Sequence, residues 1–266
     1  MGSIYRFEKI QRLRQLVEEK ALTFVLPELW PDKNEGYLFR AVESKNGVHK
    51  VREAIRKVFP ASDGFEIALL QTFKRSRYAQ CWSRCPENDA LWKGYEIRIE
   101  AERDDVSKLD GIKAYDVRYV DSVNLEEELR ALFIHHEDGK LSWKPENVLL
   151  IKRTQFSHEQ EVRLLTEIIK ENVVDRKPDW AIPAIIAVFH QEYQEGKITK
   201  EEFERHVKEL TISPTMKVSI AHVPNFIRSV MLSPSAPSEI DKQMAWFCAQ
   251  HSLNYLGKSR MYEFNL

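Results

Sequence analysis

Two kinds of hydrophobic spacing alternate along this chain of 266 residues, and they restrict its fold more than any other feature. Apolar residues three or four positions apart predict helices, whereas short runs rich in apolar and aromatic residues predict strands. Helices are expected at 8–20, 48–58, 66–73, 125–134, 180–194, 200–210 and 237–251. Strands are expected at 21–26, 78–83, 95–101, 117–120, 162–168, 218–220, 227–232 and 261–264. This order predicts an α+β fold with a central mixed, mostly antiparallel sheet flanked by helices.

The sequence predicts one domain over residues 1–266, because it contains no internal repeat, no low-complexity tract and no clear linker. The helical pair within 176–212 is the part expected to form a peripheral lobe. Its second helix is predicted to begin at a capping box, in which Thr199 and Glu202 satisfy each other's backbone N–H groups.

Charge and cysteine content narrow the class of protein. Lys and Arg number 40 against 41 Asp and Glu, so the chain as a whole is not drawn electrostatically to nucleic acid. The odd number of cysteines, 3, argues against a disulfide framework and for a reducing compartment. No segment approaches the roughly 18 apolar residues of a membrane span. We therefore expect a cytoplasmic protein that does not associate with membranes.

Familiar catalytic motifs are missing from the sequence. It has no phosphate-binding G-x-x-x-x-G-K-[ST] loop, no G-x-G-x-x-G, no G-x-S-x-G and no H-E-x-x-H. Cys81 and Cys85 lack the second pair of ligands that a zinc site needs, and His135 and His136 precede a turn-forming Asp-Gly. We therefore expect no metal.

The first candidate cluster is Trp30-Pro31-Asp32-Lys33-Asn34-Glu35, directly after a predicted strand. An aromatic ring followed by Asp32 and Glu35 in a rigid turn suits a hydroxyl-rich or cationic ligand. The alternative is a surface turn in which Asp32 caps the next segment.

The second cluster contains Trp82 and Ser83 at the end of a strand, followed by Trp92 and Tyr95. Hydroxyls and aromatic rings at strand ends often line a cleft. The alternative is that Trp82 and Trp92 are core residues.

The third cluster is Glu159-Gln160-Glu161-Val162-Arg163, at the start of a strand. Alternation along the strand would place Glu159, Glu161 and Arg163 on one face. Neighbouring carboxylates raise each other's pKa and the arginine lowers it, so one glutamate is a candidate base or hydrogen-bond acceptor. The alternative is a solvent-facing row on an edge strand with a weak surface salt bridge.

Taken in order, these segments resemble a bacterial family, domain of unknown function 2971. The matching segments, from first to last, are Tyr5-Arg6-Phe7, Trp30 to Glu35, Cys81-Trp82-Ser83, Leu91-Trp92 with Tyr95, Lys152, Glu159 to Arg163, and Val230 to Pro234 with the helix after it. The chain departs from the family at Gly94, where the family has a histidine before the tyrosine, and at Phe156, which stands near the family's tryptophan.

An arginine near the first strand, a strand-end serine and a Glu-x-Glu are also the landmarks of ADP-ribosyltransferases, which cleave the nicotinamide–ribose bond of NAD. By this analogy Arg6 binds phosphate, Ser83 orients the ribose, Glu161 is the catalytic carboxylate and Glu159 serves the acceptor. The further residues expected to contact the nucleotide are Tyr5, Asp32, Glu35, Trp82, Trp92, Tyr95 and Arg163. The acceptor, a protein or a nucleic acid, is left open.

Two other functions fit the same residues. One is a non-catalytic module that senses a nucleotide or another small ligand, and the other is a protein-interaction module in a toxin or phage-defence system. A clustered, open Ser83 and Glu161 would favour the transferase or the sensor. Buried Trp82 and Trp92, with Glu161 far from Ser83 and Arg6, would favour the interaction module.

Overall fold

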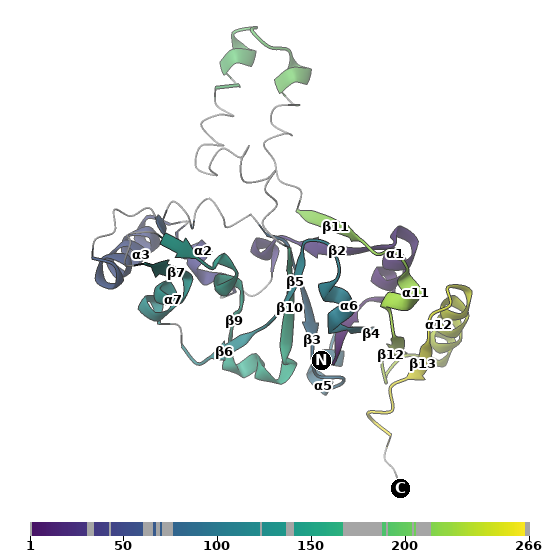
Figure 1. The fold of residues 1–266 in the computed structure, drawn as a ribbon. Helices are drawn as coiled ribbons and strands as arrows, with labels where there is room; N and C mark the ends of the chain where they lie inside the picture. The colour runs from purple at the N-terminus through teal and green to yellow at the C-terminus, as the bar shows by residue number, and fades with distance from the viewer. Residues whose placement is uncertain are drawn as a thin grey trace.

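The computed structural model describes residues 2–30, 35–42, 44–60, 66–67, 70, 77–122, 124–136, 141–166, 188–189, 191–203, 205 and 214–263. Over these residues the predicted α+β fold is confirmed (Figure 1). None of the described helices combines the length and apolar character needed to cross a membrane.

The described part of the chain forms one large sheet of nine strands. The strands are β1 (Ser3–Glu8), β2 (Ala21–Val25), β3 (Ala79–Ser83), β4 (Ile97–Glu102), β5 (Ile112–Asp116), β10 (Glu161–Thr166), β11 (Thr215–Ser219), β12 (Ser229–Leu232) and β13 (Tyr255–Lys258). Their order is β11-β2-β3-β1-β4-β12-β13, while β10 lies between β3 and β5. All pairs are antiparallel except β12 with β13, so the sheet is mixed and mostly antiparallel, as predicted.

The sheet divides at β3, and this division positions the site. One edge of β3 pairs with β10 from Glu161↔Ser83 to Leu165↔Ala79. The other edge is shared, because β1 pairs with it only at Ser83 and β2 only at Ala79. The two strands therefore part from each other beside the middle of β3, and we call this opening the fork.

Helices cover both faces of the sheet. Leu164 and Leu165 are neighbours on β10 and point to opposite faces, where they join two separate hydrophobic cores. The first core is covered by α1 (Ile10–Glu19), α6 (Arg103–Ser107), α11 (Val223–Phe226) and α12 (Ser238–Gln250). The second core is covered by α2 (Tyr37–Ala41), α3 (Lys45–Val58) and α7 (Leu125–Leu132), which lie at the left of Figure 1.

Short elements complete the described chain. They are the helix α5 (Asp89–Trp92), the 3-10 helices η1 (Pro27–Leu29), η2 (Pro145–Leu149) and η3 (Thr154–Glu159), and two strand pairs, β6 (Arg118–Val120) with β9 (Ile151–Arg153) and β7 (Phe133–His135) with β8 (Leu141–Trp143). The β6–β9 pair and η3 bring Lys152 and Tyr119 next to the start of β10.

Local sequence explains where several helices begin. Ser44 precedes α3 and its hydroxyl accepts a hydrogen bond from the Gly47 backbone N–H at 3.0 Å. Asn124 precedes α7 and its side chain accepts from Glu126 and Glu127. These caps satisfy N–H groups that have no partner within the helix.

Most predicted elements are confirmed, and the errors are informative. The sequence missed β1, β5, β8, β9 and β13, and also β7, whose first two residues were included in the helix predicted at 125–134. The strand predicted at 261–264 is wrong, because residues 261–262 form a turn. Most of the missed strands are short, and β1, β5, β9 and β13 carry charged residues or glycine, so their strand conformation depends on pairing with neighbours.

Parts of the remaining predictions lie outside the described residues. Only 66–67 and 70 of the helix predicted at 66–73 are described, together with parts of the helical pair. The capping box is confirmed, since Thr199 N donates to Glu202 Oε2 at 2.8 Å and Glu202 N to Thr199 Oγ1 at 3.2 Å. Residues 191–203 lie apart from the sheet, at the top of Figure 1.

A cavity-forming substitution tests the first core. Leu13 of α1 is 0% exposed, and we expect Leu13→Ala to lower the free energy of unfolding by about 2–5 kcal/mol, because the removed methyl groups leave a cavity. Urea denaturation measures the change. Gln11→Ala, on the exposed side of the same helix, should change the free energy of unfolding by less than about 0.5 kcal/mol. Equal effects at both positions would contradict the placement of α1.

Candidate functional site

The sequence clusters meet where β1, β3 and β10 lie side by side. Tyr5 pairs with Ser83 across β1 and β3, and Ser83 pairs with Glu161 across β3 and β10. These three residues therefore form one row across the sheet and share a face.

Five charged residues form a cluster at the end of this row, which we call the charge cluster: Glu35, Lys152, Glu159, Glu161 and Arg163. The Lys152 Nζ lies 2.7 Å from Glu159, 2.8 Å from Glu161 and 3.2 Å from Glu35. Arg163 Nε donates to Glu161 at 2.7 Å, and its Nη2 lies 2.9 Å from Glu35. Two cations are thus surrounded by three carboxylates.

Burial makes this cluster different from a surface salt bridge. Glu161 is 3% exposed and Arg163 is 0% exposed, and β10 has a strand on each side. The alternative interpretation as a solvent-facing edge row is therefore wrong. Period-two alternation holds for Glu161 and Arg163 but not for Glu159, which lies in η3 and is followed by Gln160 in the left-handed conformation. Glu159 reaches the cluster because the chain turns there.

The two buried carboxyls titrate differently. Burial raises the pKa of Glu161, but the charges of Arg163 and Lys152 outweigh it and lower this pKa to about 2. Burial raises the pKa of Glu35 above its usual value, although the same two cations oppose the effect. The pKa of Lys152 is raised, since its carboxylate neighbours outweigh the burial that lowers it. The cluster therefore keeps Glu161 and Lys152 ionised at neutral pH.

Aromatic side chains surround the cluster. The Arg163 guanidinium lies 4.3 Å from the ring centre of Trp30, and Lys152 Nζ lies 5.1 Å from that of Phe156. The backbone N–H of Glu161 donates to the Tyr119 hydroxyl at 2.7 Å. Trp30 and Glu35 of the first sequence cluster thus meet the third cluster, whereas Asp32 lies outside the described residues.

The hydroxyl of Ser83 is hydrogen-bonded to backbone groups of the turn beside it. Its hydroxyl donates to the Glu159 carbonyl at 2.5 Å and accepts from the Cys85 N–H at 2.9 Å. The side chain is buried. It lies opposite Glu161, as the transferase analogy requires, but the present contacts already use its hydrogen-bonding groups.

The three aromatic residues of the second cluster lie in different surroundings. Trp82 lies in the first core, where its indole N–H donates to Gln80 at 2.8 Å. Trp92 is also buried and meets the ring of Phe7 edge-on at 4.9 Å. Tyr95 is 44% exposed. Of the three, Tyr95 is the one with an accessible ring.

Arg6 occupies the fork. Alternation along β1 directs it to the face opposite Tyr5, but its guanidinium extends to the middle of β3, where Nη1 donates to the Cys81 carbonyl at 2.7 Å. Its Nη2 pairs with Glu8. On the same side, Gln80 Nε2 donates to the Thr23 carbonyl at 3.0 Å. Side chains thus meet backbone groups where the strands have parted.

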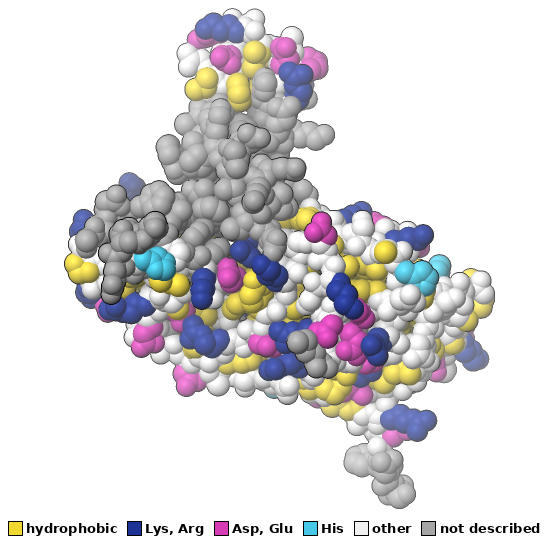
Figure 2. Space-filling view, viewed as in Figure 1, with side chains coloured by type: hydrophobic (Ala, Val, Ile, Leu, Met, Phe, Trp, Pro, Cys, Tyr) yellow, Lys and Arg dark blue, Asp and Glu magenta, His cyan; other side chains and the backbone are white. Residues whose placement is uncertain are grey.

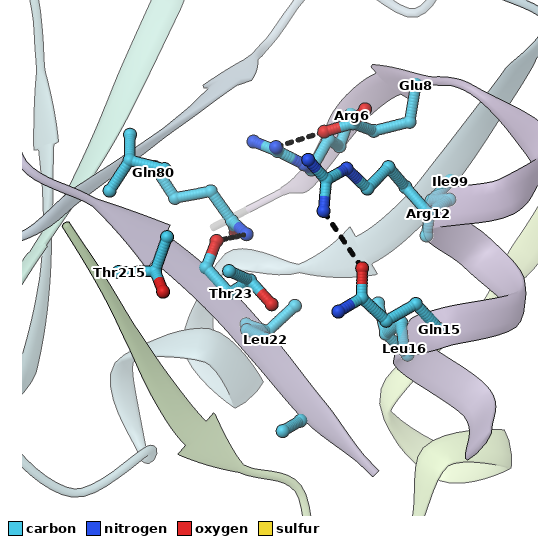
Figure 3. Close-up of a pocket in the computed structure, with 12 residues that line it drawn as sticks. Arg6, Glu8, Arg12, Gln15, Leu16, Leu22, Thr23, Gln80, Ile99 and Thr215 are labelled. Atoms are coloured by element: carbon cyan, nitrogen blue, oxygen red, sulfur yellow. Dashed lines mark hydrogen bonds and ion pairs between the residues drawn. The ribbon is translucent and has the colours of Figure 1, made fainter. Parts of the chain in front are cut away.

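A pocket with a cavity volume of about 210 Å³ opens at this fork. We call it the fork pocket, and its polar lining comprises Arg6, Glu8, Arg12, Gln15, Thr23, Gln80 and Thr215 (Figure 3). Ser83 and Glu161 are not part of its lining. Figure 3 shows Arg6 from β1 and Arg12 from α1 extending into the same opening, with Arg12 donating to Gln15 at 2.9 Å.

Sequence reasoning named Arg6 but missed Arg12, Gln15 and Gln80. These residues were missed because β1 was not predicted. Without that strand, nothing in the sequence placed Arg6 beside the first turns of α1. Lys152 was matched to the resembled family but not recognised as the centre of the charge cluster. Within the described residues, no group of three or more His, Cys, Asp or Glu side chains is arranged to hold a metal ion.

Comparisons with protein-family models, curated proteins and solved structures found no match to this chain. The resemblance to domain of unknown function 2971 and the residue roles that follow from it stay predictions.

Removing one charge tests the cluster. We expect Glu161→Gln to lower the free energy of unfolding at pH 7 by about 3–5 kcal/mol, because it leaves the buried Arg163 poorly compensated. Glu159→Gln, at a partly exposed carboxylate, should cost about 1 kcal/mol or less. Urea denaturation of both variants measures the difference.

The loss of stability in Glu161→Gln should depend on pH. The pKa of Glu161 is about 2 in the folded chain and near 4.3 in an unfolded one, so its ionised form stabilises the fold above the unfolded value. This stabilisation is lost as the pH falls through the folded value. The gap between wild type and Glu161→Gln should therefore shrink below about pH 4.3. A gap that stays constant down to pH 2 would contradict the arrangement.

Proposed function

We propose that this chain is a non-catalytic module that binds a small phosphate-bearing ligand in the fork pocket. The observation that carries the proposal is the presence of Arg6 and Arg12, from two different elements, in the lining of one pocket. Guanidinium groups remain charged at physiological pH and match phosphate oxygens with pairs of N–H donors.

The electrostatics of the pocket support an anion. Two arginines and one glutamate, Glu8, line it, so its charged side chains sum to one positive charge. Arg6 donates to Cys81 and Glu8, and Arg12 donates to Gln15. A guanidinium carries five N–H donors, so these bonds leave further donors for a ligand. Thr23 adds a polar side chain that suits the hydroxyls of a sugar.

The distribution of charge favours a small ligand over a polyanion. Lys and Arg side chains are interspersed with Asp and Glu over the face shown in Figure 2, and the whole chain has a formal charge of -1. A broad positive surface, which would attract a nucleic acid, is not a feature of this face. The positive charge of the fork pocket is local.

A second candidate is an NAD-dependent ADP-ribosyltransferase, with a protein or nucleic acid as acceptor. It is favoured by one observation, the direct pairing of Ser83 with an ionised Glu161 across two strands. A negative charge at that position stabilises an oxocarbenium-like transition state. The present contacts oppose it, because Lys152 and Arg163 already neutralise Glu161 and Ser83 is engaged in a turn. Binding of NAD to this site would have to displace Lys152.

Calorimetric titration with ADP tests the first proposal. We expect binding that Arg12→Gln weakens about tenfold or more, because a charge-assisted hydrogen bond is lost. Arg52→Gln, which removes an exposed helical arginine from α3, should leave the affinity unchanged. The affinity should also fall as the salt concentration rises. No binding of ADP, or equal effects of the two substitutions, would overturn the proposal.

Titration with NAD separates the two candidates. A binding module should release no nicotinamide above background. Release that is lost in Glu161→Gln and also reduced in the milder Glu159→Gln variant, both shown to be folded by circular dichroism, would establish the transferase instead.

A further inference from the structure

A second, mostly apolar pocket lies around the exposed residue Tyr95. It has a cavity volume of about 250 Å³, and its lining includes Ile10, Tyr95, Leu232, Ser233, Pro237 and Ile240. We call it the Tyr95 pocket. Its walls come from the first residue of α1, from the end of β12 and from the beginning of α12. The apolar lining and the hydroxyl of Ser233 suit a flat ring with polar edges.

Lining residues of the two pockets are linked at the junction of β1 and α1. Glu8 lines the fork pocket and Ile10 lines the Tyr95 pocket. The backbone N–H of Glu96, next to Tyr95, donates to the Glu8 carbonyl at 2.9 Å, and the N–H of Ile10 donates to the Glu96 carboxylate at 2.9 Å. These bonds hold the walls of both pockets together.

Charged residues of the fork pocket also influence the pKa of Tyr95. The pKa of Tyr95 is raised, first by burial and then by the Glu8 carboxylate, while Arg6 lowers it. The pKa of Tyr95 therefore depends on two charged residues that line the fork pocket, although the residue is 44% exposed.

We infer that the ligand of the fork pocket is a nucleotide, whose base lies against Tyr95 while its phosphate contacts Arg6 and Arg12. This inference rests on the proposed function and names the class of ligand. A phosphate or a sugar phosphate alone would leave the Tyr95 pocket empty. A nucleotide combines an anionic group, hydroxyls and a flat aromatic ring, and so matches the lining of both pockets in one molecule.

Three probes of increasing size test the inference by calorimetry: inorganic phosphate, ribose 5-phosphate and adenosine monophosphate. We expect adenosine monophosphate to bind at least about tenfold more tightly than ribose 5-phosphate, because stacking of a base on an aromatic side chain contributes at this level. Tyr95→Ala should abolish the difference and leave the affinity for ribose 5-phosphate unchanged. Tyr95→Phe, which keeps the ring, should preserve the difference.

The control for this test is an exposed tyrosine that lines neither pocket. Tyr193→Ala removes another exposed tyrosine, from the segment that lies apart from the sheet, and should change none of the affinities. Equal affinities for ribose 5-phosphate and adenosine monophosphate, both weakened by Arg12→Gln, would overturn this inference and leave the proposed function in place. Tighter binding of adenosine monophosphate that survives in Tyr95→Ala would also overturn it. No binding of any probe would overturn both proposals.

Discussion

The ion pair between Glu161 and Arg163 is the interaction on which the rest of the site depends. Both residues are buried on β10, and a buried charge without a partner is strongly destabilising. Arg163 also reaches Glu35, and Glu161 also reaches Lys152, so the pair connects the sheet to two other segments that meet on one of its faces. The charge cluster therefore specifies how β10, the residues before α2 and the β9 strand fit together.

The fork follows from a different constraint, the need to satisfy backbone groups. Because β1 and β2 each meet β3 at one end only, the carbonyl of Cys81 lies where no strand pairs with that edge. Arg6 donates to this carbonyl, and Gln80 donates in turn to the Thr23 carbonyl of β2. The polar side chains that satisfy backbone groups where the sheet divides also line the pocket, so stability and the proposed ligand binding involve the same residues.

The two functional candidates thus use different residues around the junction of β1 and β3. The row of Tyr5, Ser83 and Glu161 carries the landmarks of a transferase, but the side chains of Ser83 and Glu161 are already bonded to other residues. The fork pocket holds positive charge and space, and the exposed Tyr95 adds an aromatic surface in a second pocket. Burial of Trp82 and Trp92 satisfies one condition for an interaction module, whereas the proximity of Glu161 to Ser83 contradicts the other.

The sequence by itself determined the class of fold and most of the helices. The amphipathic spacing of α1, α3 and α7 and the caps at Ser44 and Asn124 are local properties, which a chain carries before it folds. The sequence also identified Trp30, Glu35, Glu161 and Arg163 as residues of interest. Their types were visible, but their ion pairs were not, because the partners are distant along the chain.

Only the tertiary structure decided how these residues are used. The strand β1 forms between β3 and β4, and its pairing is what brings Arg6 and Arg12 to one pocket. Whether β10 lies at an edge or between two strands decides whether Glu161 is exposed or buried, and alternation along a strand is the same in both cases. Local sequence therefore set the elements, whereas pairing between distant segments set burial, charge contacts and the pockets.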